Sequence, residues 1–230
     1  MNIKINKKQA AYLNDNAICE YVFGSQLYGT AGPDSDVDKM VIYKEDAIRF
    51  LDYLPNIHQF QYDDEESNTQ YIYSTKRQFL RNAVSGDSTI NVEIALMVDD
   101  FMGMDLDIQF FRTYKVLKAF LGFAKRDLRD YESKNKAFHV QRGIYMVKKL
   151  LEGKRPNIKD IQKLKITPVF KQIAENEVKL LRTQINDMYN QSELSSYRLH
   201  ALDVMSFSNN EDLGLSVLMA MSNNIKEFKY

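Results

Sequence analysis

The segment that most constrains the fold is VFGSQLYGTAGPDSDVDKMVIY at residues 22–43, in which a turn-rich loop joins two apolar runs. Asp36 and Asp38 stand at the start of the second run. Strand side chains alternate, so residues two apart share a face. Two carboxylates this close repel each other, and each raises the pKa of the other unless a cation lies between them. The segment therefore predicts a strand–loop–strand unit with a site for a hard divalent ion such as Mg²⁺.

Gly24 and Ser25 end the first apolar run. Glycine lets the backbone come close to a ligand, and Ser25 begins a short predicted helix, SQLYG, whose first backbone N–H groups favour phosphate. A Gly-Ser pair or an Asp-x-Asp alone is common in turns. The order strand, Gly-Ser, short helix, turn, Asp-x-Asp and strand is far more specific, and it predicts a phosphate-binding turn beside the carboxylates.

The rest of the chain divides into a mixed first part and a helical second part. Strands are predicted at 17–23, 36–43, 57–63 and 69–75, and the β-branched segment TINVEIALMV at 89–98 predicts a further strand. A helix is predicted at 76–86, ending at Gly86. Four later segments carry helical spacing, at 108–126, 136–153, 168–189 and 211–227. The predicted fold is α+β, with a small mixed β-sheet domain and flanking helices at 1–105 and a helical domain at 106–230.

Charge is distributed unevenly, although the whole chain is neutral. Residues 1–111 carry nine Lys or Arg and eighteen Asp or Glu, whereas residues 112–165 carry sixteen and five. This asymmetry suggests a metal-binding part and a phosphate-binding part. The basic stretch taken alone is also explained by solvated helix faces.

Three features that the sequence lacks indicate the cellular location and the redox chemistry of the protein. The single cysteine, Cys19, excludes an intrachain disulfide and a cysteine-rich zinc site. No apolar stretch approaches the roughly 20 residues of a membrane span, and the N-terminus lacks the apolar run of a signal peptide. We therefore expect a cytoplasmic protein with no membrane partner, and the sequence does not predict its oligomeric state.

The 22–43 segment resembles the signature of the DNA polymerase beta-like nucleotidyltransferase superfamily, which matches at Phe23, Gly24, Ser25, Asp36, Val37 and Asp38. The finer form GSQLYGTAGPDSDVD, together with KNKAFHVQRGIYMVKKLLEGK at 134–154, is similar to the RNA-ligase-associated predicted nucleotidyltransferases of bacteria and phages. The resemblance implies transfer of a nucleoside monophosphate from a nucleoside triphosphate to a hydroxyl acceptor, with Mg²⁺ or Mn²⁺. An RNA or tRNA end is the first choice of acceptor. The alternatives are a protein or small-molecule acceptor, and an antitoxin-like or partner-binding protein that uses the same fold.

The resemblance also implies roles for particular residues of the first domain. Asp36 and Asp38 would hold two metal ions, and Gly24 and Ser25 would anchor the phosphates. The superfamily usually adds a third carboxylate from a later strand. Glu93 is expected in this role, as ligand or base, because a carboxylate inside an apolar strand is costly without a partner.

Basic residues of the helical half are the remaining candidates for binding the nucleotide. His139 and Arg142 lie three residues apart on one helical stripe, and arginine gives forked hydrogen bonds to phosphate. Lys118 and Lys136 are further candidates. A structural role is equally compatible with the pattern, with Arg142 forming a salt bridge to an acid of the first domain.

Overall fold

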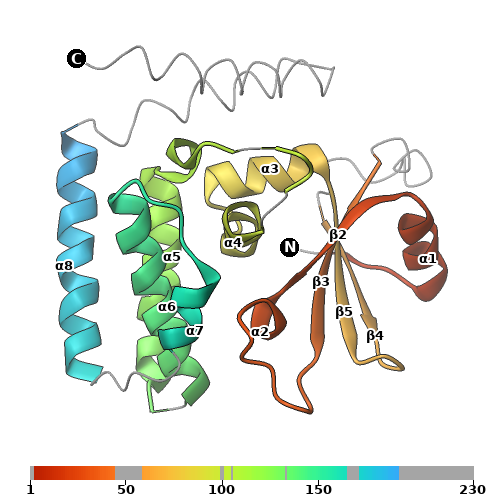
Figure 1. Cartoon of the computed structure of the whole chain (residues 1–230), viewed down its shortest axis with the longest axis horizontal. Coiled ribbons are helices and arrows are strands. Elements are labelled where there is room, and N and C mark those ends of the chain that lie inside the picture. Colours follow the sequence, from red (N-terminus) through yellow and green to blue (C-terminus); the bar gives the residue numbers. More distant parts are fainter. Residues whose placement is uncertain are drawn as a thin grey trace. The chain divides into compact units, whose positions relative to one another are not determined.

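The computed structural model describes residues 3–44, 59–98, 101–104, 106–132, 134–164 and 171–191. The chain packs as two compact units, Met1–Leu80 and Arg81–Tyr230 (Figure 1). The division predicted between residues 105 and 106 follows the change in sequence pattern and stays a prediction. The predicted helix at 211–227 lies outside the described residues.

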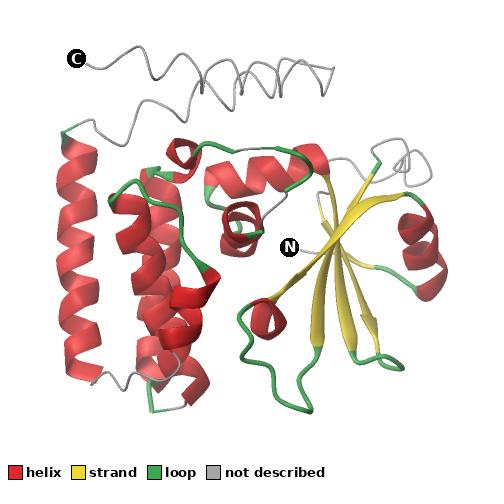
Figure 2. Cartoon of the chain, in the orientation of Figure 1, coloured by secondary structure: helices red, strands yellow, loops and turns green. Residues whose placement is uncertain are grey.

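The first unit is built on a five-stranded mixed sheet (Figure 2). Its strands, in spatial order, are β1 (Ile3–Lys4), β4 (Gln59–Asp64), β5 (Thr69–Thr75), β3 (Val37–Tyr43) and β2 (Ala17–Phe23). β1 with β4 and β3 with β5 are parallel pairs, whereas β2 with β3 and β4 with β5 are antiparallel. The strands predicted from 17–23, 36–43 and 69–75 are confirmed, and β4 confirms the described part of the strand predicted at 57–63.

The apolar end of β3 is covered on both faces. On one face Val41 and Tyr43 pack in a core with residues of α1 (Lys7–Asp15), β4 and β5. On the other face Met40 and Ile42 are also buried. Burial on both sides explains why the strand reads as a continuous apolar run rather than an alternating one, and the start of the strand, Val37 to Lys39, is only partly buried.

Two helices each follow directly after a strand of the sheet. The four-residue α2 (Gly24–Leu27) follows β2 directly, and α3 (Lys76–Ser85) follows β5 across the boundary between the units. α3 ends at Gly86, where φ is +72° and a Cβ would lie 2.8 Å from the backbone nitrogen of Val116. The predicted helix at 76–86 and its glycine stop are confirmed.

The strand predicted at 89–98 is wrong, because this segment forms α4 (Thr89–Met97). The helix begins at Ser88, whose hydroxyl accepts a hydrogen bond from the backbone N–H of Asn91 at 3.3 Å. Every residue from Asn91 to Met97 is buried. A short helix that is buried on all sides and mostly apolar shows no 3.6-residue period, so its sequence cannot be told from that of a buried strand.

The second unit continues as a group of helices. These are α5 (Tyr114–Asp127), α6 (Lys134–Leu151), α7 (Ile158–Leu164) and α8 (Lys171–Asn190), with 3₁₀ turns at Ile108–Phe111 and Leu128–Asp130. The segment predicted as one helix at 108–126 is broken before Thr113, which caps α5 by accepting from the backbone N–H of Val116. α5 packs against both α6 and α8 (Figure 1). No helix among the described ranges has the length and apolar character needed to cross a membrane.

Candidate active site

Asp38 and Gly24 lie against each other across the β2–β3 pair. Asp38 is paired with Phe23, so its carboxylate lies where β2 turns into α2. Gly24 has a φ of +65°, and a Cβ on it would overlap Oδ2 of Asp38 and lie 3.2 Å from Cγ. Only glycine accepts both this φ and this approach without strain. The Gly-Ser turn and the second carboxylate of the Asp-x-Asp therefore share one local site.

The two carboxylates differ in environment. Asp36 is exposed and lies just before β3. Asp38 is the second residue of β3 and is half-buried. Burial, and after it the charge of Asp36, raises the pKa of Asp38 to about 6. A divalent cation between the two carboxylates would reverse both effects by stabilising the charged form. The donor set of carboxylate oxygens at a half-exposed position fits Mg²⁺ or Mn²⁺.

Ser25 lies in α2, at the other side of the turn. Its carbonyl accepts hydrogen bonds from the backbone N–H of Thr30 at 2.8 Å and from the Thr30 hydroxyl at 3.3 Å, so the loop after α2 folds back onto the helix. The residue before the helix, Phe23, has extended backbone and an apolar side chain that cannot cap it. The start of α2 therefore offers backbone N–H groups of the kind that bind anions.

Glu93 lies in the second unit, on α4, and not on a strand of the sheet. It is buried, and its Oε1 lies 3.3 Å from Nε of Arg142 on α6. The guanidinium of Arg142 also lies over the ring of Phe123, 5.3 Å from its centroid. Glu93 already has a cationic partner, so its burial alone no longer argues for a metal. The observed contact matches the structural interpretation of Arg142, a salt bridge to an acid within residues 1–105.

A second cluster of ionisable groups joins the end of α5 to the start of α6. The buried Asp127 accepts hydrogen bonds from Arg126 at 2.8 Å and Lys136 at 3.4 Å, and its Oδ2 lies 3.0 Å from Nδ1 of His139. Burial raises the pKa of Asp127, but the bonds from Arg126 and His139 outweigh it and lower the value to about 2. Asp127 is thus an anion near pH 7.

The imidazole of His139 is neutral near pH 7. Burial, and after it the charge of Arg142, lowers the pKa of His139 despite the nearby Asp127. A neutral ring that donates from Nδ1 to Asp127 keeps Nε2 as an acceptor. The sequence singled out His139 and Lys136 but missed Asp127. Asp127 lies on the preceding helix, and the only local signal was an acid at the end of a basic helix.

The predicted site residues fall into separate groups. Gly24, Ser25, Asp36 and Asp38 come together in the first unit, whereas Lys136, His139 and Arg142 gather in the second. Lys118 is exposed on α5, with Nζ 3.1 Å from the hydroxyl of Tyr114. Across the described ranges, no three His, Cys, Asp or Glu side chains form a group that could hold a metal ion. A third carboxylate beside Asp36 and Asp38 therefore stays a prediction.

Comparison with known protein families gives a match for the part of the chain that contains the first of these groups. Residues 19–94 match the model of the nucleotidyltransferase domain family. The matched segment runs from β2 into α4 and contains Gly24, Ser25, Asp36, Asp38 and Glu93. No curated protein matches the chain.

Proposed function

We propose that this chain, which carries a nucleotidyltransferase domain at residues 19–94, transfers a nucleoside monophosphate from a nucleoside triphosphate to a hydroxyl of an RNA or tRNA end. Mg²⁺ or Mn²⁺ is the proposed cofactor. The observation that carries the proposal is the approach of Asp38 to Gly24. It places Asp38, one of the two carboxylates, directly beside a glycine turn that opens a helix, within the matched segment. The proposed cation site and the proposed phosphate site are therefore adjacent.

The residues of this local site have distinct roles. Asp36 and Asp38 would hold the two proposed metal ions, which when bound would supply activation of the acceptor hydroxyl and stabilisation of the departing pyrophosphate. Gly24 and Ser25 receive the β and γ phosphates through backbone N–H groups. Because the pKa of Asp38 is raised to about 6, binding of the metal below that pH requires Asp38 to lose a proton.

Residues of the second unit also have proposed roles, which their observed contacts restrict. Glu93 is the proposed third carboxylate, as ligand or base, but it would have to leave its ion pair with Arg142 to reach a metal. Lys136, His139 and Arg142 are proposed to bind the phosphates of the nucleotide. For His139 this contact would use Nε2 or a protonated ring, since Nδ1 lies against Asp127.

Labelling tests the transfer reaction directly. The protein is incubated with each α-³²P-labelled nucleoside triphosphate, Mg²⁺ or Mn²⁺, and total RNA. We expect label in the RNA, and none with the double variant Asp36→Asn, Asp38→Asn. Transfer that persists in the double variant would show that the metal site is misplaced. Label in protein or in a small molecule instead would reassign the acceptor.

A partner-binding function is the second candidate, and the edge of the sheet is the observation that favours it. β2 stands at one end of the strand order, and its Ile18 and Val22 are 49% and 38% exposed. An exposed edge strand with apolar side chains can accept a strand from another chain. Calorimetric titration separates the two functions. A transferase binds the nucleotide more tightly with Mg²⁺, whereas a partner-binding protein shows no difference.

A further inference from the structure

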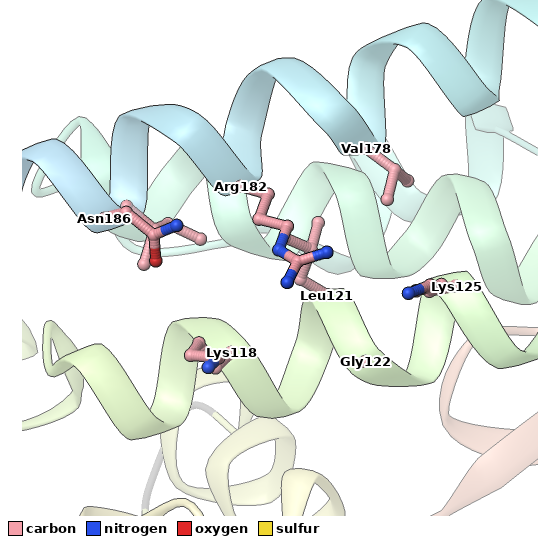
Figure 3. A pocket seen from close by; sticks show the side chains of 8 residues that line it. Lys118, Leu121, Gly122, Lys125, Val178, Arg182 and Asn186 are labelled. Carbon is pink, nitrogen blue, oxygen red and sulfur yellow. The ribbon is translucent and has the colours of Figure 1, made fainter.

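A cationic groove runs between α5 and α8 in the second unit. It has a volume of about 190 Å³, and three of the eight residues that line it are Lys118, Lys125 and Arg182, while none is acidic. Its floor is apolar, because Leu121, Val178 and Ile185 are buried beneath it. Figure 3 shows the side chain of Arg182 reaching from α8 toward α5, between Lys118 and Lys125.

The spacing of the cations suits an extended anion rather than a single phosphate. Lys118 and Lys125 are seven residues apart on α5, which is two helical turns or roughly 10 Å along the axis. The only carboxylate of α5, Asp127, is buried and bonded to Arg126 and Lys136. The outward face of α5 is therefore positive along its length.

An aromatic pair adjoins one end of the groove. The rings of Tyr114 and Tyr189 lie 4.2 Å apart between centroids, and Tyr189 is 45% exposed. Lys118 lies over the Tyr114 ring at 4.9 Å. The hydroxyl of Tyr114 donates to Asn186, a residue of the groove, at 3.4 Å. An exposed ring beside a positive groove is the combination with which proteins bind single-stranded nucleic acid.

Gly122 is the third feature, and packing does not explain it. It lies in the middle of α5, where glycine destabilises a helix relative to alanine. A Cβ on Gly122 would meet nothing within 4 Å. The groove, which Gly122 lines between the two lysines, is the space that its missing side chain leaves open.

We infer that this groove binds a single-stranded polynucleotide. Phosphates contact Lys118, Lys125 and Arg182, one base lies on the apolar floor above Gly122, and the next stacks on Tyr189. Lys118 thus contacts the strand and not the nucleoside triphosphate. The inference rests on the proposed function, because it names the part of the chain that holds the acceptor.

Fluorescence anisotropy tests the groove without any transfer step. The probes are fluorescein-labelled ten-residue oligouridylate, oligothymidylate and poly-glutamate, each titrated with the full chain at several salt concentrations. The triple variant Lys118→Ala, Lys125→Ala, Arg182→Ala should lose at least tenfold in affinity for the oligonucleotides. A plot of the logarithm of its association constant against the logarithm of the salt concentration should be less steep by about 2, since each contacted phosphate of a single strand contributes roughly 0.7. A preference for one of the two oligonucleotides decides between RNA and DNA.

Two further variants test the shape of the groove and the aromatic ring beside it without changing the charge. Gly122→Leu should fill the groove and weaken binding at least tenfold. Tyr189→Ala should weaken it by about tenfold through lost stacking, while Tyr189→Phe keeps the ring and the affinity. The controls Lys115→Ala and Lys179→Ala remove exposed charges of the same helices outside the groove and should have little effect.

The outcomes separate this inference from the proposed function. Oligonucleotide binding that all the groove variants leave unchanged, or poly-glutamate binding as tight as that of the oligonucleotides, would overturn the groove. The double variant Asp36→Asn, Asp38→Asn must keep its oligonucleotide affinity. If no transfer is found but the binding pattern holds, the proposed function fails and the groove stands.

Discussion

At the scale of single residues, Asp38 links stability to pH. Its pKa is near 3.9 when unfolded and about 6 when folded. Between these values the folded state holds a proton that the unfolded state lacks, so the free energy of unfolding falls as the pH rises from about 4 to 6. Asp38→Asn should remove this dependence and raise the stability at pH 7 by about 1–2 kcal/mol, allowing for partial exposure. Urea unfolding without divalent ions at pH 5 and pH 7 measures it.

Asp34→Asn is the matched control for this prediction. Asp34 is exposed in the same loop and lies outside the site, and its substitution leaves Asp38 in place, so the fall in stability between pH 5 and pH 7 should persist. A wild-type chain that is as stable at pH 7 as at pH 5, with Asp38→Asn no more stable, would contradict the environment assigned to Asp38.

Gly24 sets the geometry that brings Asp38 to the turn. Gly24→Ala forces a Cβ against the Asp38 carboxylate at a positive φ, so we expect a loss of about 1–3 kcal/mol in stability and loss of Mg²⁺-dependent nucleotide binding. Gly32→Ala is the control in the same loop, because its Cβ would meet only the Ser35 hydroxyl, at 3.9 Å. Thermal unfolding and calorimetry report the two effects, and equal behaviour of both variants would refute the close approach of Gly24 to Asp38.

The pair of Arg142 and Glu93 predicts a coupled loss. Arg142→Ala leaves Glu93 buried without its ion pair and should destabilise the fold by about 3 kcal/mol. The double variant Arg142→Met, Glu93→Leu should recover most of the loss, because an apolar pair of similar size needs no counter-charge. Denaturant unfolding of the double-mutant cycle measures the coupling. If the single variants are each neutral in stability but lose nucleotide affinity, the pair serves the nucleotide instead.

At the scale of elements, the crossing of α5 and α6 depends on Gly143. A Cβ there would lie 3.0 Å from both the Ala124 Cβ and the Phe120 carbonyl oxygen, so Gly143→Ala should push the helices apart and destabilise the fold by about 1–3 kcal/mol. Gly122→Ala, on the open side of α5, should instead stabilise it by about 1 kcal/mol. Thermal unfolding of the two variants should show opposite signs, and a common sign would show that the crossing is not tight.

At the scale of the whole molecule, ligand binding should appear as stability. A ligand that binds only the folded chain raises the free energy of unfolding by about 2.7 kcal/mol at 100 times its Kd. A nucleoside triphosphate with Mg²⁺ should therefore raise the thermal midpoint of the wild type. The rise should vanish with the Asp36→Asn, Asp38→Asn variant and with EDTA. A rise that survives both would place the nucleotide away from the carboxylates.

Local patterns in the sequence were enough for much of the first unit, although they did not predict β1 and α1. Residues 22–43 specify strand, turn and strand through a short-range order of apolar runs, Gly24 and the Asp-x-Asp, and this order is also what the family match contains. The helices α5, α6 and α8 follow from 3.6-residue spacing, whereas α7 was not predicted. Gly86 ends α3 with a positive φ, as its residue type predicts. These features depend on residues close together in the chain, so the sequence by itself determined them.

Tertiary structure decided the features that depend on distant residues. Burial on every side made TINVEIALM the helix α4, although its β-branched residues favour a strand. The partner of Glu93 is Arg142, 49 positions later, and the partner of His139 is Asp127 on another helix. The groove of Lys118, Lys125 and Arg182 exists only because α8 packs on α5. No periodicity in the sequence encodes such contacts, because they arise from which buried faces meet when the helices pack.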